Sequence, residues 1–101
     1  MKVFISQPMK DKTDDEIISE REKIIEFIKD KYPEEKIEII DSFVKGVKVK
    51  ANPLWTLGKS LQLLSTADLA VFTESALWSR GCKIEYDCCI QYNIRTLVLM
   101  K

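Results

Sequence analysis

The chain has 101 residues, which is enough for one small domain with a single core and too short for two. It carries 16 acidic and 16 basic residues, so no overall charge field indicates DNA, RNA or an anionic membrane as a partner. No apolar run approaches the roughly 20 residues that span a bilayer, and Met1–Ser6 lacks the layout of a signal peptide.

The N-terminal part of the chain predicts a strand followed by a helix. Residues Lys2–Ser6 are mostly Val, Phe and Ile, as expected of a strand buried on both faces, and Gln7-Pro8 ends it. Thr13-Asp14-Asp15-Glu16 is a capping box that opens a helix. Pro33 ends this helix. One side of it carries the apolar residues Ile17, Ile24, Ile25 and Ile28.

The middle of the chain predicts a short strand over Lys36–Asp41 and a helix that starts at Asn52-Pro53, an N-cap followed by proline. In the intervening Ser42–Ala51, valines alternate with lysines, so this segment is a hairpin-like excursion, a basic loop over a site or a plain solvated connection. Gly58 inside the helix costs roughly 1 kcal/mol against alanine, which indicates close packing or the approach of a ligand. The helix carries leucines at helical spacing, Leu54, Leu57, Leu61 and Leu64.

The C-terminal part predicts a buried strand over Asp68–Thr73, a helix over Ser79–Tyr92 with Asn93 as its stop, and a last strand over Arg95–Met100. Strands and helices therefore alternate along the whole chain. This order predicts one α/β domain over residues 1–101, a small three-layer αβα flavodoxin-like or Rossmann-like fold. Its parallel sheet has about four strands, with helices on both faces and right-handed crossovers.

Three cysteines, Cys82, Cys88 and Cys89, fall in the last predicted helix. An odd count without a disulfide-framework spacing is typical of a reducing cytoplasm. We interpret them as small buried hydrophobic residues rather than metal ligands. The chain has no histidine and no Cys-x-x-Cys pair, so we expect neither a zinc site nor another metal or cofactor.

In a parallel α/β sheet, ligands bind at the carboxyl ends of the strands. The residues at these ends are Ser6, Gln7, Pro8 and Met9, then Asp41, then Thr73–Gly81. The turn that ends at Gly81 offers free backbone N–H groups and the positive end of the helix dipole. Glu85 follows within the first turns of the helix and shares a face with Cys82 and Cys89. A carboxylate there either charges the helix start or does chemistry.

Several of these side chains have both a binding and a structural interpretation. Ser6 and Gln7 could supply hydrogen bonds, although Pro8 alone would set an ordinary turn. Trp78 could stack on a planar base or lie exposed at an edge or interface, and Arg80 could pair with a phosphate or be a plain surface residue. The chain contains neither a P-loop nor a G-x-G-x-x-G motif. Without histidine, Ser-His-Asp and Cys-His mechanisms are excluded, which leaves carboxylate chemistry.

Several segments resemble the nucleoside 2-deoxyribosyltransferase superfamily, which includes the 2'-deoxynucleoside 5'-monophosphate N-glycosidases. They are the strand Ala67–Val71, the turn Ser79-Arg80-Gly81 and Glu85. The opening Val3–Met9, together with Leu57-Gly58-Lys59-Ser60 and Arg80–Glu85, looks closer still to a small uncharacterised bacterial and phage branch of it. The resemblance covers almost the whole chain.

The resemblance implies a role for several residues. Glu85 takes the place of the glutamate that attacks the sugar C1', and Ser79 matches in spacing a serine that contacts the phosphate. A carboxylate of the preceding helix in some relatives falls near Ser60 here, and an aromatic of the first loop falls near Gln7-Pro8. The resemblance further implies a small-molecule nucleoside or nucleotide as substrate, no nucleic-acid polymer or membrane as partner, no cofactor, and a homodimer or higher homo-oligomer with shared sites.

The expected reaction is cleavage or exchange of the N-glycosidic bond of a 2'-deoxynucleoside or its 5'-monophosphate. The ionised carboxylate would trap the oxocarbenium-like sugar as a covalent ester. Asp41 and Asp68 are the candidates for the acid that protonates the departing base. Two alternatives stay open, a nucleotide-binding or sensing module without turnover and a hydrolase that cleaves NAD. The differences at Ser60 and at Gln7-Pro8 favour the sensing module.

Overall fold

In the computed structural model, which describes residues 1–8, 11–40 and 53–99, four parallel strands form one sheet in the order β2-β1-β3-β4. This confirms the α/β class and the parallel sheet. The elements of the sheet are β1 Lys2–Ser6, β2 Glu38–Ile39, β3 Leu69–Thr73 and β4 Arg95–Leu99. The predicted residues Met9, Asp41, Ser42–Ala51, Asn52 and Met100 lie outside the described residues.

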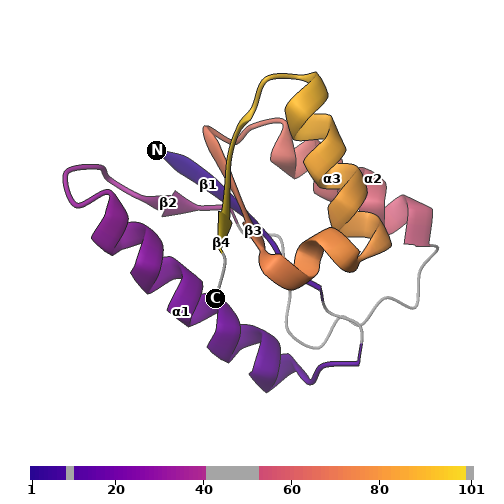
Figure 1. Ribbon diagram of the computed structural model, residues 1–101, viewed down its shortest axis with the longest axis horizontal. Coiled ribbons are helices and arrows are strands. Elements are labelled where there is room, and N and C mark those ends of the chain that lie inside the picture. The colour runs from indigo at the N-terminus through magenta and orange to yellow at the C-terminus, as the bar shows by residue number, and fades with distance from the viewer. Residues whose placement is uncertain (9–10, 41–52, 100–101) are drawn as a thin grey trace.

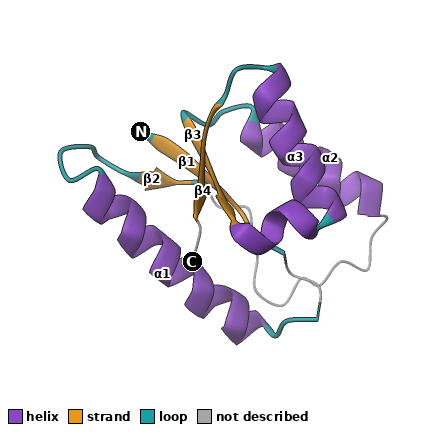
Figure 2. Cartoon of the chain, in the orientation of Figure 1, coloured by secondary structure: helices purple, strands orange, loops and turns teal. Residues whose placement is uncertain are grey.

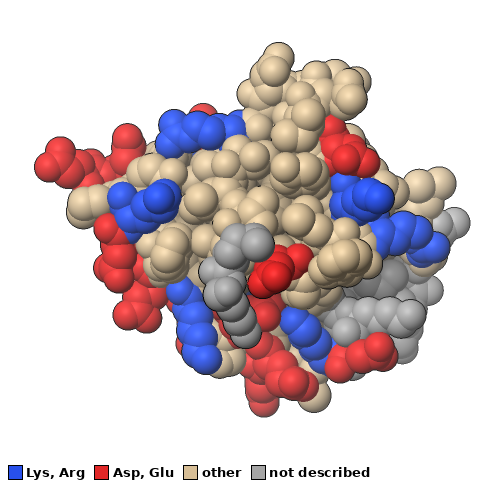
Figure 3. Space-filling model, viewed as in Figure 1, with Lys and Arg blue, Asp and Glu red and all other residues tan. Residues whose placement is uncertain are grey.

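Helices cover both faces of the sheet, as the alternation of strands and helices predicts. Helix α1 (Asp14–Lys31) lies on one face, and α2 (Pro53–Leu64) and α3 (Arg80–Gln91) lie on the other (Figures 1 and 2). In the described part of the chain, no helix has the length and apolar composition to cross a bilayer. Acidic and basic side chains are interspersed over the face shown in Figure 3, in keeping with the balanced composition.

The alternation of side chains along β1 and β3 divides the core into two clusters. Val3 and Ile5 of β1 point to the α1 face, where they pack with Ile24 and Ile28. Phe4 of β1 points to the opposite face, where it belongs to a cluster with residues of α2 and α3. The strands are buried on both faces because helices cover both, which explains their nearly continuous apolar sequence.

The helix boundaries follow the local signals in the sequence. Thr13 and Glu16 form the predicted capping box, with Glu16 N donating to Thr13 Oγ1 at 3.1 Å and Thr13 N donating to Glu16 Oε1 at 3.0 Å. Helix α1 ends at Lys31, two residues before Pro33. Asn93 has a φ of 59°, the left-handed conformation expected of a residue that stops a helix, and it leads from α3 into β4.

Three local features differ from the sequence-based expectation. Within the described residues, the second strand covers only Glu38–Ile39, whereas the sequence predicts it over Lys36–Asp41. Residues Glu74–Trp78, expected as a turn, form a short 3₁₀-helix, η1, which brings the chain from β3 to the start of α3. At Gly58, an added Cβ would meet no described atom within 4 Å beyond its chain neighbours and the backbone of its own helix. The close packing expected at Gly58 is therefore not found within the described chain, and the approach of a ligand there stays a prediction.

Candidate functional site

Glu85 is a buried carboxylate on the sheet-facing side of α3. Only 6% of its surface is exposed, although acidic residues are rarely buried without a partner. Cys82 and Cys89, three residues before and four after, are buried on the same side. The sequence prediction that these three residues share one face is therefore confirmed.

The partner of Glu85 is Ser6, the last residue of β1. Ser6 Oγ donates a hydrogen bond of 2.6 Å to Glu85 Oε1, and both side chains are buried. This distance falls in the range of about 2.5–2.7 Å that is typical of a hydroxyl donating to a carboxylate. Two residues that lie 79 positions apart in the chain thus meet at the carboxyl end of β1.

The surroundings of Glu85 act on its pKa in opposite directions. Burial is the largest influence and raises the pKa, because the charged form loses its water. The hydroxyls of Ser6 and Ser60 lower it, because they hydrogen-bond to the charged form. The net effect is a pKa above the ordinary value of a glutamate. The protein thus keeps a carboxylate where water is largely excluded and compensates for part of the cost with hydroxyl donors.

Glu85 borders a cavity of about 190 Å³ at the carboxyl end of β1. The first loop, α2 and the start of α3 all contribute to its wall. The cavity brings together seven residues predicted for the site, Ser6, Gln7, Pro8, Ser60, Ser79, Gly81 and Glu85. It also includes residues that the sequence analysis did not select, Phe4, Ile5, Pro53, Thr56, Leu57 and Cys82.

The contribution of α2 to the cavity has a recognisable sequence signal. Pro53, Thr56 or Leu57, and Ser60 recur every three to four residues and so share one side of the helix. Only Ser60 was selected from the sequence, because the resemblance pointed to it. The other positions could have been found by extending the same helical spacing towards the start of α2.

Two predicted residues are not brought to this cavity. Trp78 is 88% exposed and lines a separate, larger groove of about 990 Å³ between α1 and the η1–β4 region, whose described lining does not include Glu85. Arg80 is exposed and is not among the described residues that line the Glu85 cavity. Met9 and Asp41, also predicted for the site, lie outside the described residues.

Gln7 lines the cavity, but its amide group is bound to α1. Gln7 Nε2 donates to Glu20 Oε1 at 2.8 Å and to the Ile17 carbonyl at 3.3 Å. Gln7 Oε1 accepts a hydrogen bond of 3.0 Å from the buried Arg21 guanidinium. Glu20 also pairs with Lys12 at 3.2 Å. The side chain of Gln7 therefore ties the end of β1 to α1.

Ser79 stands at the N-cap of α3, directly before Arg80 and Gly81. Its backbone is extended, as an N-cap requires, yet among the described residues its hydroxyl makes no capping hydrogen bond. The first backbone N–H groups of a helix have no intrahelical acceptor. The start of α3 thus offers backbone donors beside a cavity-lining serine hydroxyl that is not used as a cap.

Asp68 does not belong to the site. It precedes β3, and its Oδ2 accepts a hydrogen bond of 2.8 Å from Lys2 N at the start of β1. Lys2 lies four residues before Ser6, about 13 Å along the strand at roughly 3.3 Å per residue. The expectation of Asp68 as the acid for the departing base is therefore wrong, because the residue lies at the amino end of the sheet.

The thiols near Glu85 are held in the neutral form. Burial raises the pKa of Cys82, the neighbouring Glu85 charge adds to this, and the Ser6 and Ser79 hydroxyls oppose it. Burial raises the pKa of Cys89 to about 11. Because the thiolate is the nucleophilic form of cysteine, these thiols are poor nucleophiles at neutral pH and Glu85 is the better candidate.

Comparison of the chain with protein-family models, with curated proteins and with solved structures found no match.

Proposed function

We propose that this protein cleaves or exchanges the N-glycosidic bond of a 2'-deoxynucleoside or its 5'-monophosphate, with Glu85 as the nucleophile. The observation that carries the proposal is the buried Glu85 carboxylate, bound by Ser6 at 2.6 Å and bordering a cavity at the carboxyl end of the sheet. A carboxylate that keeps a hydroxyl donor in a poorly hydrated site is suited to trap a developing positive charge.

The reaction begins with cleavage of the bond between C1' and the base nitrogen, whose electron pair leaves with the base. Glu85 forms an ester bond with C1' as the oxocarbenium-like character develops. The departing base takes a proton from an acid, for which Asp41 is the remaining sequence candidate. Water or a second base then attacks C1', and the C1'–Glu85 ester bond breaks with its electron pair returning to the carboxylate. The attacking group gives its proton to the acid that was deprotonated in the first step, and the product is the free sugar or the exchanged nucleoside.

The size of the cavity indicates which part of the substrate it can hold. Drug-sized ligands occupy pockets of roughly 300–1,000 Å³, and the cavity beside Glu85 has about 190 Å³. We infer that the described lining holds the sugar next to Glu85, with the phosphate towards Ser79 and the base extending outward.

The proposal is tested by incubating the protein with a panel of deoxynucleosides, their monophosphates and NAD, and by separating the products chromatographically. Release of a free purine or pyrimidine supports the proposal, and base exchange in the presence of a second base identifies a transferase. Binding of nucleotides without release of base indicates a sensing module instead. Release of nicotinamide from NAD indicates the NAD-cleaving alternative.

The sensing module is the second candidate, and Ser60 is the residue that favours it. The resemblance places a substrate-contacting carboxylate near this position in some relatives, whereas this chain has the Ser60 hydroxyl, which lines the same cavity as Glu85 and lowers the Glu85 pKa. Among the described residues that line the cavity, Glu85 is the one carboxylate, which leaves fewer groups to orient the sugar. The panel above distinguishes the two candidates because only an enzyme releases base.

We expect the 5'-monophosphate to bind more tightly than the free nucleoside. Ser79 lines the cavity at the start of α3, where the backbone donors and the helix dipole favour an anion. The change Ser79→Ala should weaken monophosphate binding by roughly 1–2 kcal/mol and leave nucleoside binding nearly unchanged. Calorimetric titration of both ligands measures this. Equal affinities of the parent protein for the two ligands would contradict the phosphate assignment.

We also propose that the protein is at least a homodimer and that it resides in a reducing cytoplasm, where the three free thiols remain reduced. Leu54, Trp55 and Trp78 are 73%, 61% and 88% exposed, which is unusual for large apolar side chains of a small isolated domain. Light scattering at micromolar concentration should therefore give at least twice the mass of one 101-residue chain. The mass of a single chain would rule the dimer out.

A further inference from the structure

We propose that Ser6 is a positioning residue, whose hydroxyl holds Oε1 of Glu85 so that Oε2 is the oxygen that attacks the sugar. This inference deepens the proposed function and rests on it. Ser6 was selected from the sequence as a group that would bind substrate directly. The structure assigns it a different task, because its hydroxyl proton is donated to Glu85 Oε1 at 2.6 Å.

The backbone of Ser6 is fixed by the sheet. It ends β1, a central strand, and pairs in register with Phe72 of β3. The residue is only 2% exposed. A hydroxyl at the rigid end of a central strand can hold a carboxylate oxygen in one place, whereas the carboxylate itself is carried by three rotatable bonds. The burial of both groups also keeps water from competing for the hydrogen bond.

The single hydroxyl proton of Ser6 acts in favour of the ionised form of Glu85. A hydroxyl that donates to a carboxylate stabilises the ionised form, which is the nucleophile. The Ser60 hydroxyl of α2 acts in the same direction, and burial acts in the opposite one. Among the described residues, the titratable groups linked to this pair are the Cys82 and Cys89 thiols of α3, with Lys12 acting on Cys82.

The test compares Ser6→Ala and Ser6→Thr with the parent protein, using the release of base as a function of pH. Ser6→Ala should lower kcat by about 10- to 100-fold, the effect of losing a hydrogen bond to a charged group. KM should change by no more than about twofold, because the residue acts through Glu85 and not on the substrate. Ser6→Thr restores a hydroxyl and should recover much of the loss.

The pH dependence separates positioning from a merely structural role. The Ser6 hydroxyl lowers the pKa of Glu85, so its removal should move the acid limb of the kcat profile to higher pH. Ser65→Ala is the matched control, since this exposed hydroxyl donates to the Gln62 carbonyl outside the cavity. Its profile should match that of the parent. An unchanged acid limb in Ser6→Ala would overturn the proposal.

A second measurement does not depend on turnover. Titration of the Glu85 side-chain carboxyl carbon by NMR should show a higher pKa in Ser6→Ala than in the parent. If the parent releases no base from any substrate, the proposed function fails, while this titration still tests the link between Ser6 and Glu85. Identical titration curves in the parent and in Ser6→Ala would overturn the positioning role whatever the activity.

Discussion

Glu85→Gln should abolish base release while leaving the fold intact. Glutamine has nearly the shape of glutamate, and its amide oxygen can still accept the 2.6 Å hydrogen bond from Ser6. It cannot form the ester with C1', so we expect a loss on the order of 10⁴-fold or more, as for the removal of other essential nucleophiles. Base release is measured by chromatography and the fold by circular dichroism. Unaltered turnover in a folded variant would disprove the mechanism.

The matched control for this change is Asp87→Asn. Asp87 lies two residues further along α3 and is exposed, so the substitution removes one negative charge from the same helix without touching the cavity. Its activity should equal that of the parent. A comparable loss in both variants would mean that the charge of the helix, and not the Glu85 carboxylate, supports the reaction.

The same substitution has a consequence for stability whose sign follows from the pKa. Burial raises the pKa of Glu85 above its ordinary value of 4.5, so the folded protein binds this proton more tightly than the unfolded chain. The resulting stabilisation is fully present below the unfolded pKa and is lost as the pH rises through the folded pKa.

Glu85→Gln lacks this dependence. As the pH rises, only the parent loses this stabilisation, so the free energy of unfolding of the variant should increase relative to that of the parent. Urea unfolding from pH 4 to pH 8 measures the difference. If Glu85 served only as a charge at a helix start, the variant would instead lose about 0.3–1 kcal/mol at neutral pH. A more stable but inactive variant would identify Glu85 as a residue kept for function at the expense of stability.

The features that could be predicted from the sequence are those set by neighbouring residues. The capping box of Thr13 and Glu16, the stop at Asn93 and the period of the buried isoleucines in α1 all depend on local backbone chemistry. The burial of Glu85 was implied by its spacing from Cys82 and Cys89. The parallel sheet followed from the alternation of elements, because parallel strands require a crossover between them.

The features that could not be predicted depend on contacts between distant parts of the chain. Nothing around Gln7 indicates that its amide would bind Glu20 and Arg21 of α1. The sequence left open whether Trp78 stacks on a base or lies exposed, and only the structure of η1 places it, exposed, at the groove on the α1 side. Spacing along the chain identifies the edge of the sheet on which a residue lies, but not the face towards which a loop side chain turns.

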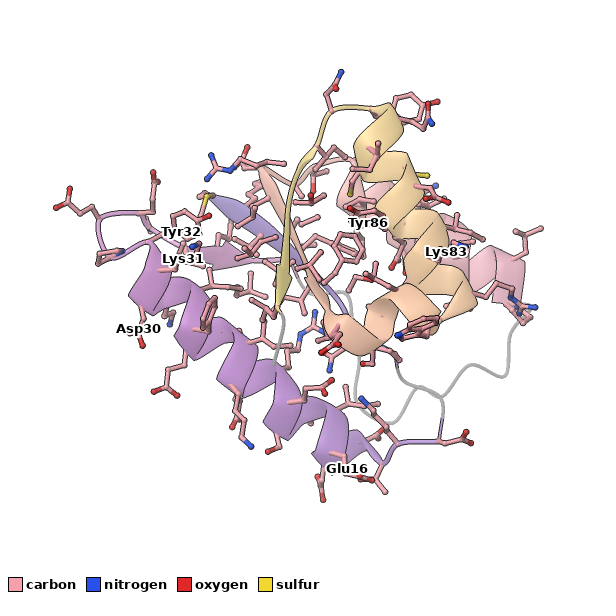
Figure 4. All side chains as sticks on the ribbon, in the orientation of Figure 1. Glu16, Asp30, Lys31, Tyr32, Lys83 and Tyr86 are labelled. Carbon is pink, nitrogen blue, oxygen red and sulfur yellow. The ribbon has the colours of Figure 1, made fainter. Side chains whose placement is uncertain are left out.

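Phe72→Ala should cost about 3–5 kcal/mol of stability, the range for removing a buried aromatic side chain. Phe72 is fully buried in β3 and meets the Tyr86 ring of α3 edge-to-face at 5.3 Å between centroids. Tyr86 lies between α3 and the sheet (Figure 4). Since a small domain has a total stability of only about 5–15 kcal/mol, this one side chain supports a large part of the fold. Urea unfolding measures the loss.

Phe27→Ala is the matched control, because Phe27 is 47% exposed on α1 and leaves no closed cavity when truncated. Its loss of stability should be well below that of Phe72→Ala, and a similar loss in both variants would contradict the role of the buried Phe72 side chain.

The substitution at Phe72 should also affect the candidate site. The cluster around Phe72 includes Cys82 and Cys89, the two residues that flank Glu85 on α3. When this packing is lost, α3 is held less firmly against the sheet and the distance between Ser6 and Glu85 is less well defined. We therefore expect kcat to fall in Phe72→Ala even where the protein is folded, whereas Phe27→Ala should keep the activity of the parent.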